Sequence, residues 1–126
     1  MLKLNGLTKE FRSTKAVDSV TLTIPDGQMV GVIGRSGAGK STLLRLLNRL
    51  TDPTGGQILF GDRDVASLSG RDLRQWRSEC AMIFQQFNLV GRLDVVTNVL
   101  TGRLFHQPWW KALLKLYTPQ ERAFAI

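Results

Sequence analysis

The chain has 126 residues, 43% hydrophobic and 21% charged, which is the composition of a globular protein and excludes a disordered one. The net charge of +7 is scattered along the sequence, so we expect a solvated basic surface and no nucleic-acid partner. One cysteine excludes a disulfide framework, and no apolar run approaches the roughly 20 residues that span a bilayer, so any link to a membrane must come through a partner.

The front of the chain predicts strands. Residues Leu2–Leu4, which precede a break at an Asn-Gly pair, indicate a short first strand. Residues Val20–Ile24 alternate between apolar and hydroxyl side chains, as in a strand with one buried face. After the turn residues Pro25–Gly27, the continuous apolar run Met29–Ile33 predicts a strand that is buried on both faces and leads directly into Gly34.

The middle of the chain predicts two helices with a strand between them. Apolar residues recur at helical spacing in Leu43–Leu50, and the turn residues Asp52–Gly56 end that helix. Residues Gln57–Phe60 predict a strand. Ser69, with Asp72 three residues later, is typical of a helix N-cap followed by an acid in the first turn.

The remaining sequence predicts one more buried strand, Cys80–Phe84, and then helices at Val95–Leu100 and Trp109–Tyr117. The segment Thr118–Glu121 combines an N-cap threonine, a proline at the first helical position and a glutamate at the third, so a new helix begins there. The sequence stops at Ile126, about one turn later, which is too short for a stable helix, and we therefore expect a truncated chain.

The strongest motif is Gly34–Ser41, which matches the phosphate-loop pattern GxxxxGK[ST] in full and lies between a predicted strand and a predicted helix. Its glycines let the backbone N–H groups converge on a phosphate, and the helix N-terminus adds partial positive charge. The alternative is a glycine-rich turn that binds no ligand. Lys40 would reach the β- and γ-phosphates of ATP, and the Ser41 hydroxyl would bind Mg²⁺. The residues predicted to hold the nucleotide are Gly34, Arg35, Ser36, Gly37, Ala38, Gly39, Lys40, Ser41 and Thr42.

Other segments resemble the ATP-binding subunits of ABC transporters over essentially the whole chain. Phe11 resembles the aromatic of the family's adenine-stacking loop, with a plain core residue as the alternative. Met82–Leu89 resembles the family's glutamine loop, in which Gln85 would approach Mg²⁺ and the attacking water, with a strand-end capping amide as the alternative. Within the family, Asn98–Leu104 and Leu46–Leu50 resemble the phosphonate importers.

The resemblance implies an α/β fold, the P-loop NTPase core of an ABC ATPase. Residues 1–90 would form the nucleotide-binding core, with a β-rich N-terminal subdomain followed by strand, P-loop and helix, and residues 91–126 would begin an α-helical subdomain that is cut at its C-terminus. The implied cofactors are ATP and Mg²⁺, with Lys40 and Gln85 as catalytic residues and Ser41 and Gln85 near the metal.

The implied function is that of an importer's ATP-binding subunit, for phosphonates, which couples ATP binding and hydrolysis to transport. It would lie peripherally at the cytoplasmic face of the inner membrane. Its partners would be transmembrane permease subunits, a second ATP-binding subunit in a homodimer of the full-length form and, indirectly, a periplasmic or surface substrate-binding protein.

Three family elements cannot be placed in this sequence: the LSGGQ signature, the apolar strand ending in Asp-Glu and the switch histidine. Because phosphoryl transfer depends on positioning and electrostatic stabilisation, we expect the chain alone to bind nucleotide weakly and to turn it over negligibly. Three alternatives stay open: a non-catalytic nucleotide-binding remnant, an ABC ATPase for another cargo, and a P-loop protein without a transport role. Phe11 and the segment Phe84-Gln85 argue against the last of these.

Overall fold

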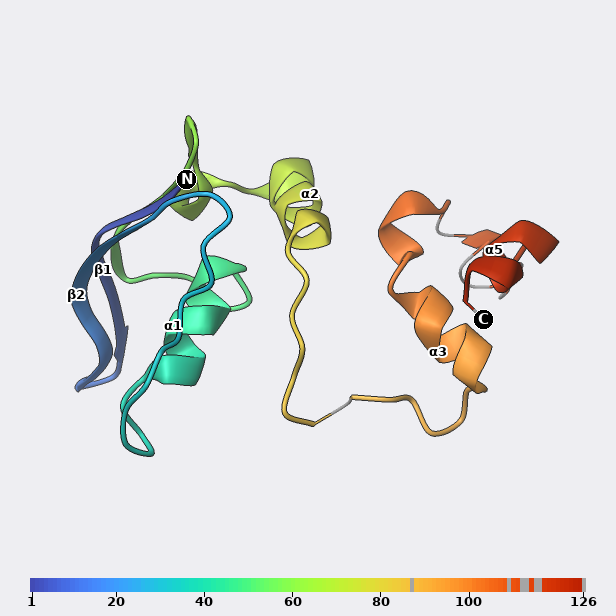
Figure 1. Cartoon of the computed structure of the whole chain (residues 1–126), viewed down its shortest axis with the longest axis horizontal. Helices are drawn as coiled ribbons and strands as arrows, with labels where there is room; N and C mark the ends of the chain where they lie inside the picture. The colour runs from blue at the N-terminus through green and yellow to red at the C-terminus, as the bar shows by residue number, and fades with distance from the viewer. Residues whose placement is uncertain (87, 109, 112–113, 115–116, 126) are drawn as a thin grey trace. The chain divides into compact units, whose positions relative to one another are not determined.

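The structure is a computed structural model that describes residues 1–126 except 87, 109, 112–113, 115–116 and 126. The chain forms two compact units, Met1–Ala81 and Met82–Ile126 (Figure 1). This division lies before the subdomain boundary that the sequence predicts after residue 90. The Asn98 side chain accepts the Val90 N–H at 2.9 Å and donates to the Val90 carbonyl at 3.2 Å, so Val90 is joined to the second unit.

The first unit is built on an antiparallel sheet of four described strands in the order β2-β1-β3-β4. The strands are β1 (Leu2–Phe11), β2 (Thr14–Ile24), β3 (Gly55–Phe60) and β4 (Arg63–Asp64). The predicted strands at 2–4, 20–24 and 57–60 are confirmed. Strand β1 continues through the predicted break because Gly6, at φ 56°, forms an irregularity within it, and its N–H is bonded to the Thr21 hydroxyl at 3.0 Å.

Three helical segments join the sheet in the first unit: α1 (Lys40–Leu47), the 3-10 helix η1 (Val65–Ser67) and α2 (Gly70–Glu79). The helices predicted from Lys40 and after Ser69 are confirmed. One core cluster joins sheet and helices through Leu4, Leu7, Val17, Leu46, Ile58, Val65 and Trp76. Trp76 stacks at a tilt against Phe60, with ring centroids 5.4 Å apart, and its indole N–H donates to the Leu47 carbonyl at 3.0 Å. Both α1 and α2 are thereby packed on the sheet.

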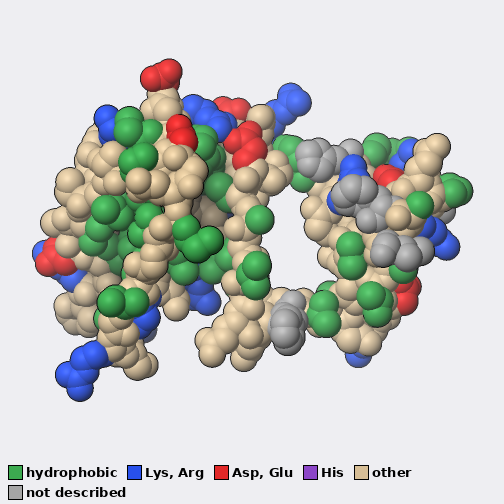
Figure 2. All heavy atoms as spheres, viewed as in Figure 1, with side chains coloured by type: hydrophobic (Ala, Val, Ile, Leu, Met, Phe, Trp, Pro, Cys, Tyr) green, Lys and Arg blue, Asp and Glu red, His purple; other side chains and the backbone are tan. Residues whose placement is uncertain are grey.

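Two of the predicted strands are wrong. Met29–Ile33 and Cys80–Phe84 have no regular secondary structure, and Met29, Ile33 and Ile83 are 100%, 95% and 96% exposed. A strand that is buried on both faces needs hydrogen-bonded neighbours and covering layers. None of the described strands pairs with either segment. Met29–Ile33 is therefore exposed throughout, whereas Cys80, Met82 and Phe84 are half-buried. Figure 2 shows apolar side chains exposed on both units.

We expect the purified chain to self-associate through the segment Met29–Ile33, because an exposed apolar segment loses its contact with water when copies associate. Replacing Ile33 by Lys should lower the weight-average mass measured by sedimentation velocity at several protein concentrations. The control is Thr23→Lys, which adds the same charge at an exposed position of β2 and removes no apolar surface. An equal decrease in both variants would mean that net charge, and not this segment, governs association.

The second unit contains α3 (Val95–Thr101), the 3-10 helix η2 (Leu104–His106) and α5 (Pro119–Phe124). The helix predicted at 95–100 is confirmed as α3, whose N-cap Asp94 accepts the Thr97 N–H at 2.8 Å; this bond and one from the Thr97 hydroxyl lower the pKa of the Asp94 carboxyl. The predicted start of α5 is confirmed by a capping box between Thr118 and Glu121.

The helix predicted at Trp109–Tyr117 falls in large part outside the described residues. Across the described part of the chain, the helices are too short and too polar for any of them to cross a membrane.

Candidate functional site

The phosphate loop ends at the N-terminus of α1. Gly37 and Gly39 have φ angles of 82° and 81°, in the left-handed region that glycine occupies without strain. Gly39 is the N-cap, and its carbonyl accepts the N–H of Leu43 at 2.8 Å, which closes the first helical turn. The N–H groups of an N-cap and the three residues after it have no partner within a helix, and this first turn carries no acid. The helix start therefore suits an anion such as a phosphate group.

Lys40 already lies across the loop. Its ammonium donates to the carbonyls of Gly34 at 2.7 Å and Arg35 at 2.8 Å, and Ala38 N–H donates back to the Arg35 carbonyl at 3.2 Å. These bonds close the loop into a ring that holds the Lys40 ammonium. An ammonium carries three donors that rotate freely, so it can exchange a carbonyl for a phosphate oxygen at little geometric cost.

The same loop packs against β2 at Gly39. A Cβ added at Gly39 would overlap the carbonyl oxygen of Ala16 in β2, so the helix start and the strand are in direct contact. Phe11 pairs with Thr14 at the end of the β1–β2 hairpin, only two residues along β2 from Ala16, or about 7 Å. The hairpin end and the phosphate loop therefore lie close together within one unit.

Phe11 offers an aromatic face at this hairpin end. Its side chain is 50% exposed, so the interpretation of Phe11 as a core residue finds no support in its burial. The Lys9 ammonium lies 4.9 Å from the centre of the ring, in cation–π contact. Because alternate residues of a strand point to the same face, the spacing of Lys9 and Phe11 could have predicted this pair. A base could stack on the ring next to the loop.

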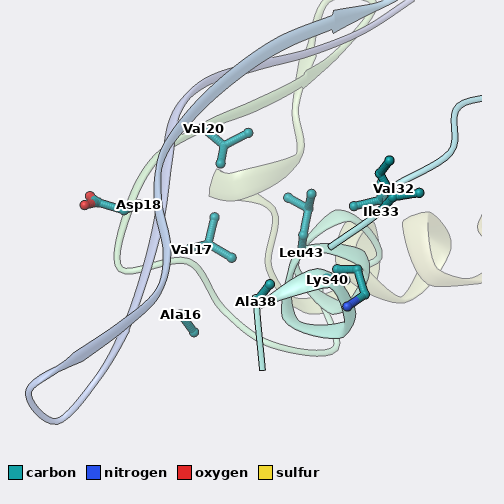
Figure 3. A pocket seen from close by; sticks show the side chains of 10 residues that line it. Ala16, Val17, Asp18, Val20, Val32, Ile33, Ala38, Lys40 and Leu43 are labelled. Carbon is teal, nitrogen blue, oxygen red and sulfur yellow. The ribbon is translucent and has the colours of Figure 1, made fainter. Parts of the chain in front are cut away.

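A cavity of about 170 Å³ lies between β2 and the start of α1 (Figure 3). Its apolar lining includes Val17 and Val20 of β2, Val32 and Ile33 before the loop, and Leu43 of α1. Ligand pockets for nucleotide-sized molecules are larger, roughly 300 Å³ or more, and a triphosphate needs polar walls. The lining also includes Ala38, Gly39 and Lys40, so the cavity adjoins the phosphate loop, and it is too small to hold a whole nucleotide.

The structure does not bring every predicted site residue into one unit. Ser41 is exposed in the first turn of α1, and Thr42 is half-buried behind it. Gln85 belongs to the other unit, where it is exposed in a segment without helix or strand. Among the described residues, no cluster of three His, Cys, Asp or Glu side chains could hold a metal ion. Any Mg²⁺ here would depend on hydroxyl, amide, phosphate and water oxygens, which is the ligand set that this ion accepts.

The sequence matches the ABC transporter family over residues 17–124. It is 60% identical to the phosphonates import ATP-binding protein PhnC of Rhodopseudomonas palustris strain BisB5, over 100% of this chain and 47% of that protein. It is 59% identical to the protein of the same name from Rhizobium etli, over 100% of this chain and 45% of the relative. The chain therefore spans about half the length of the curated relatives it matches.

Solved structures of ATP-binding cassettes share the fold. The dimeric post-hydrolysis state of the cassette MJ0796, bound to ADP and Pi, matches with a TM-score of 0.82 and 29% identity, over 99% of this chain and 54% of the other. A second dimeric structure of MJ0796, described as a bacterial ABC transporter cassette, matches with a TM-score of 0.78 and 30% identity, over 97% and 52% of the two chains. The α/β fold predicted from the sequence, as the N-terminal part of such a cassette, is confirmed.

Proposed function

Because the chain belongs to the ABC transporter family, we propose that it binds ATP on the loop Gly34–Thr42 as the front half of a transport ATPase. The observation that carries this proposal is the contact between Gly39 and Ala16, which holds an anion-binding helix start beside the aromatic end of the hairpin. The two features match the two ends of a nucleotide, since one suits phosphate and the other suits a base.

Each predicted residue has a proposed role. The amides of the loop and of the first turn of α1 donate to the phosphates, and the Lys40 ammonium bonds the β- and γ-phosphate oxygens. The Ser41 hydroxyl contributes one ligand to Mg²⁺, which when bound neutralises charge on the phosphates. Phe11 stacks on adenine. Gln85, with an amide that both donates and accepts, positions the attacking water near the metal once the full-length protein is assembled.

For the whole protein, we propose phosphonate import. The support is the 60% identity to an import ATP-binding protein over the full length of this chain. Two complete subunits would pair, as the MJ0796 cassette does in its dimeric structures, and would act on membrane permease subunits from the cytoplasmic face of the membrane. A substrate-binding protein would deliver the cargo. Hydrolysis would belong to that assembly, because this sequence contains neither the LSGGQ signature nor an apolar strand ending in Asp-Glu.

The test of the proposed site is saturable binding of a fluorescent ATP analogue, with Mg²⁺, to the purified chain. A folded sample that shows no saturable binding would contradict the proposal for this chain. Co-purification of the full-length protein with its permease tests the transport role, and a full-length protein that is active without any membrane partner would contradict that role.

Replacing Phe11 by Ala should raise the Kd for the analogue about tenfold, because stacking of a base on an aromatic ring contributes on the order of 1–3 kcal/mol. Phe11→Tyr keeps the ring and should bind within a factor of about two. Titration of both variants by fluorescence anisotropy checks this expectation. Equal weakening in the two variants would show that the ring does not stack on the base.

A further inference from the structure

Arg49 combines a buried charge with an unfavourable backbone conformation. It is 6% exposed, and it follows the C-cap of α1, Asn48, with a φ of 55°. Helices commonly end with a left-handed residue, but glycine is favoured there because a Cβ raises the backbone energy. Burial also removes the guanidinium from water. Because both the left-handed backbone and the buried charge are unfavourable, the side chain of Arg49 is expected to make specific compensating contacts.

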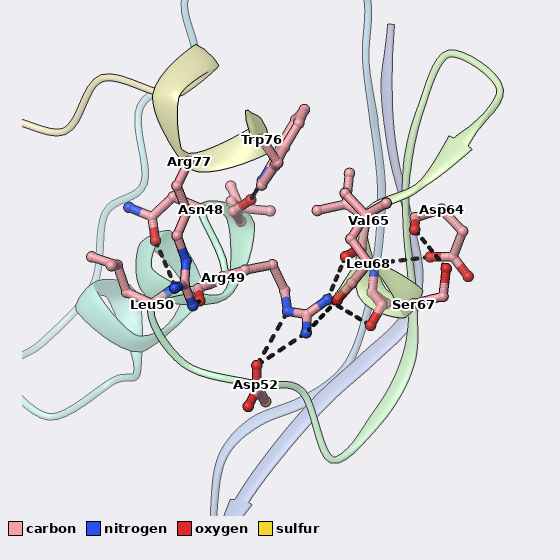
Figure 4. A network of polar contacts seen from close by, with 12 residues as sticks. Asn48, Arg49, Leu50, Asp52, Asp64, Val65, Ser67, Leu68, Trp76 and Arg77 are labelled. Atoms are coloured by element: carbon pink, nitrogen blue, oxygen red, sulfur yellow. Dashed lines mark hydrogen bonds and ion pairs between the residues drawn. The ribbon is translucent and has the colours of Figure 1, made fainter. Parts of the chain in front are cut away.

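The guanidinium is fully engaged with backbone oxygens from one other element (Figure 4). It donates to the carbonyls of Val65, Ala66 (2.6 Å) and Leu68 (3.4 Å) in and just after η1. It also donates to the Asp52 carboxylate from two nitrogens, at 3.3 Å and 3.1 Å. Only the planar five-donor fork of arginine can serve all these acceptors at once, since a lysine has a single nitrogen.

Side chains of α2 hold the same end of α1. Arg77 donates to the Arg49 carbonyl, and the Trp76 indole donates to the Leu47 carbonyl at 3.0 Å (Figure 4). The last carbonyls of a helix have no partner within it, so these bonds complete the end of α1 from outside. The C-terminal end of α1 is therefore fixed to both η1 and α2.

We propose that Arg49 is a positioning residue for the phosphate loop, which it holds through the length of α1. This proposal rests on the proposed nucleotide site. The helix has eight residues, is about 12 Å long, and among these described residues only Leu46 is fully buried. Leu43 and Leu47 are partly buried against the same core cluster, but apolar contact is non-directional and leaves the position of the helix along its axis weakly defined. The clamp at Arg49 and the contact of Gly39 with Ala16 fix its two ends, so loss of the clamp lets the helix start shift under the loop.

The first measurement is nucleotide affinity of Arg49→Lys, which keeps the charge and loses the fork. In the folded chain, its Kd for the fluorescent ATP analogue with Mg²⁺ should rise about tenfold. Lysine cannot make all the bonds of Arg49, so the start of α1 is less firmly positioned under the phosphate loop. The control is Ile58→Val in β3, which lowers stability by trimming the shared core and removes none of the hydrogen bonds at the ends of α1. Urea unfolding identifies conditions in which both variants are fully folded, and there Ile58→Val should bind like the unaltered chain.

The second measurement needs no nucleotide. The Leu43 amide donates to the Gly39 carbonyl in the first turn of α1, and its hydrogen exchange reports the order of that turn. In Arg49→Lys it should exchange at least about fivefold faster than in Ile58→Val at matched stability. If Arg49→Lys matches Ile58→Val in both affinity and exchange, Arg49 is merely structural and the proposal is overturned. If the unaltered chain binds no nucleotide, the proposed site fails instead, and Leu43 exchange alone decides the role of Arg49.

Discussion

Lys40→Ala is expected to abolish measurable binding of ATP with Mg²⁺, with a rise in Kd of about 100-fold or more. Bonds from a charged donor contribute about 1.5–3 kcal/mol each, and about 2.7 kcal/mol corresponds to 100-fold in affinity. Two effects contribute here, and they overlap because the same ammonium serves both. The variant loses the ammonium that meets the phosphates, and it loses the bonds to the Gly34 and Arg35 carbonyls that draw the loop into a ring.

The matched control for this expectation is Arg35→Ala. It removes the same charge from the same loop but keeps the backbone N–H of residue 35, and the Arg35 carbonyl remains available to Lys40. We expect a rise in Kd of less than about tenfold, since a general positive potential is a weaker attraction than a positioned donor. Equal losses in titrations of the two variants would show that overall charge governs binding and would contradict the role of Lys40.

Local sequence signals predicted the helices well. The start of α5 follows from Thr118, Pro119 and Glu121 alone, because a capping box is formed by neighbours in the sequence. The helix α1 follows from the change to helical spacing after the phosphate loop. Local signals could not predict whether Met29–Ile33 forms a strand. An apolar run shows that a segment needs partners, but whether a strand forms depends on residues elsewhere that pair with it.

For the candidate site too, the sequence indicated the contiguous part and missed the contacts between distant segments. The loop pattern singled out Gly34–Ser41 because the amides, the lysine and the hydroxyl that would face a phosphate are contiguous in the chain. The contact of Gly39 with Ala16 and the clamp of Arg49 on η1 join segments that are far apart in sequence. Neither carries a pattern of its own, since an alanine in a strand and an arginine after a helix are both common. The roles assigned to Gly34–Thr42, Phe11 and Gln85 all stay predictions.

Gly39→Ala is the second change with a large expected effect, and Gly37→Ala is its matched control. The two glycines have nearly the same φ, 81° and 82°, so both variants place an alanine in the left-handed region at a cost of about 1–2 kcal/mol. Their surroundings differ. A Cβ at residue 37 would meet nothing within 4 Å, whereas a Cβ at residue 39 would overlap the Ala16 carbonyl oxygen.

We therefore expect Gly37→Ala to lower the free energy of unfolding by about 1 kcal/mol and Gly39→Ala to lower it by about 3 kcal/mol or more. The additional loss arises because α1 must move away from β2, or β2 must bend, to admit the methyl group. Urea unfolding measures both values. Since that movement also separates the phosphate loop from the hairpin end that carries Phe11, Gly39→Ala should bind the ATP analogue less tightly even when it is fully folded. Equal stability losses in the two variants would mean that the loop does not rest on β2, and the observation that carries the proposed nucleotide site would be lost.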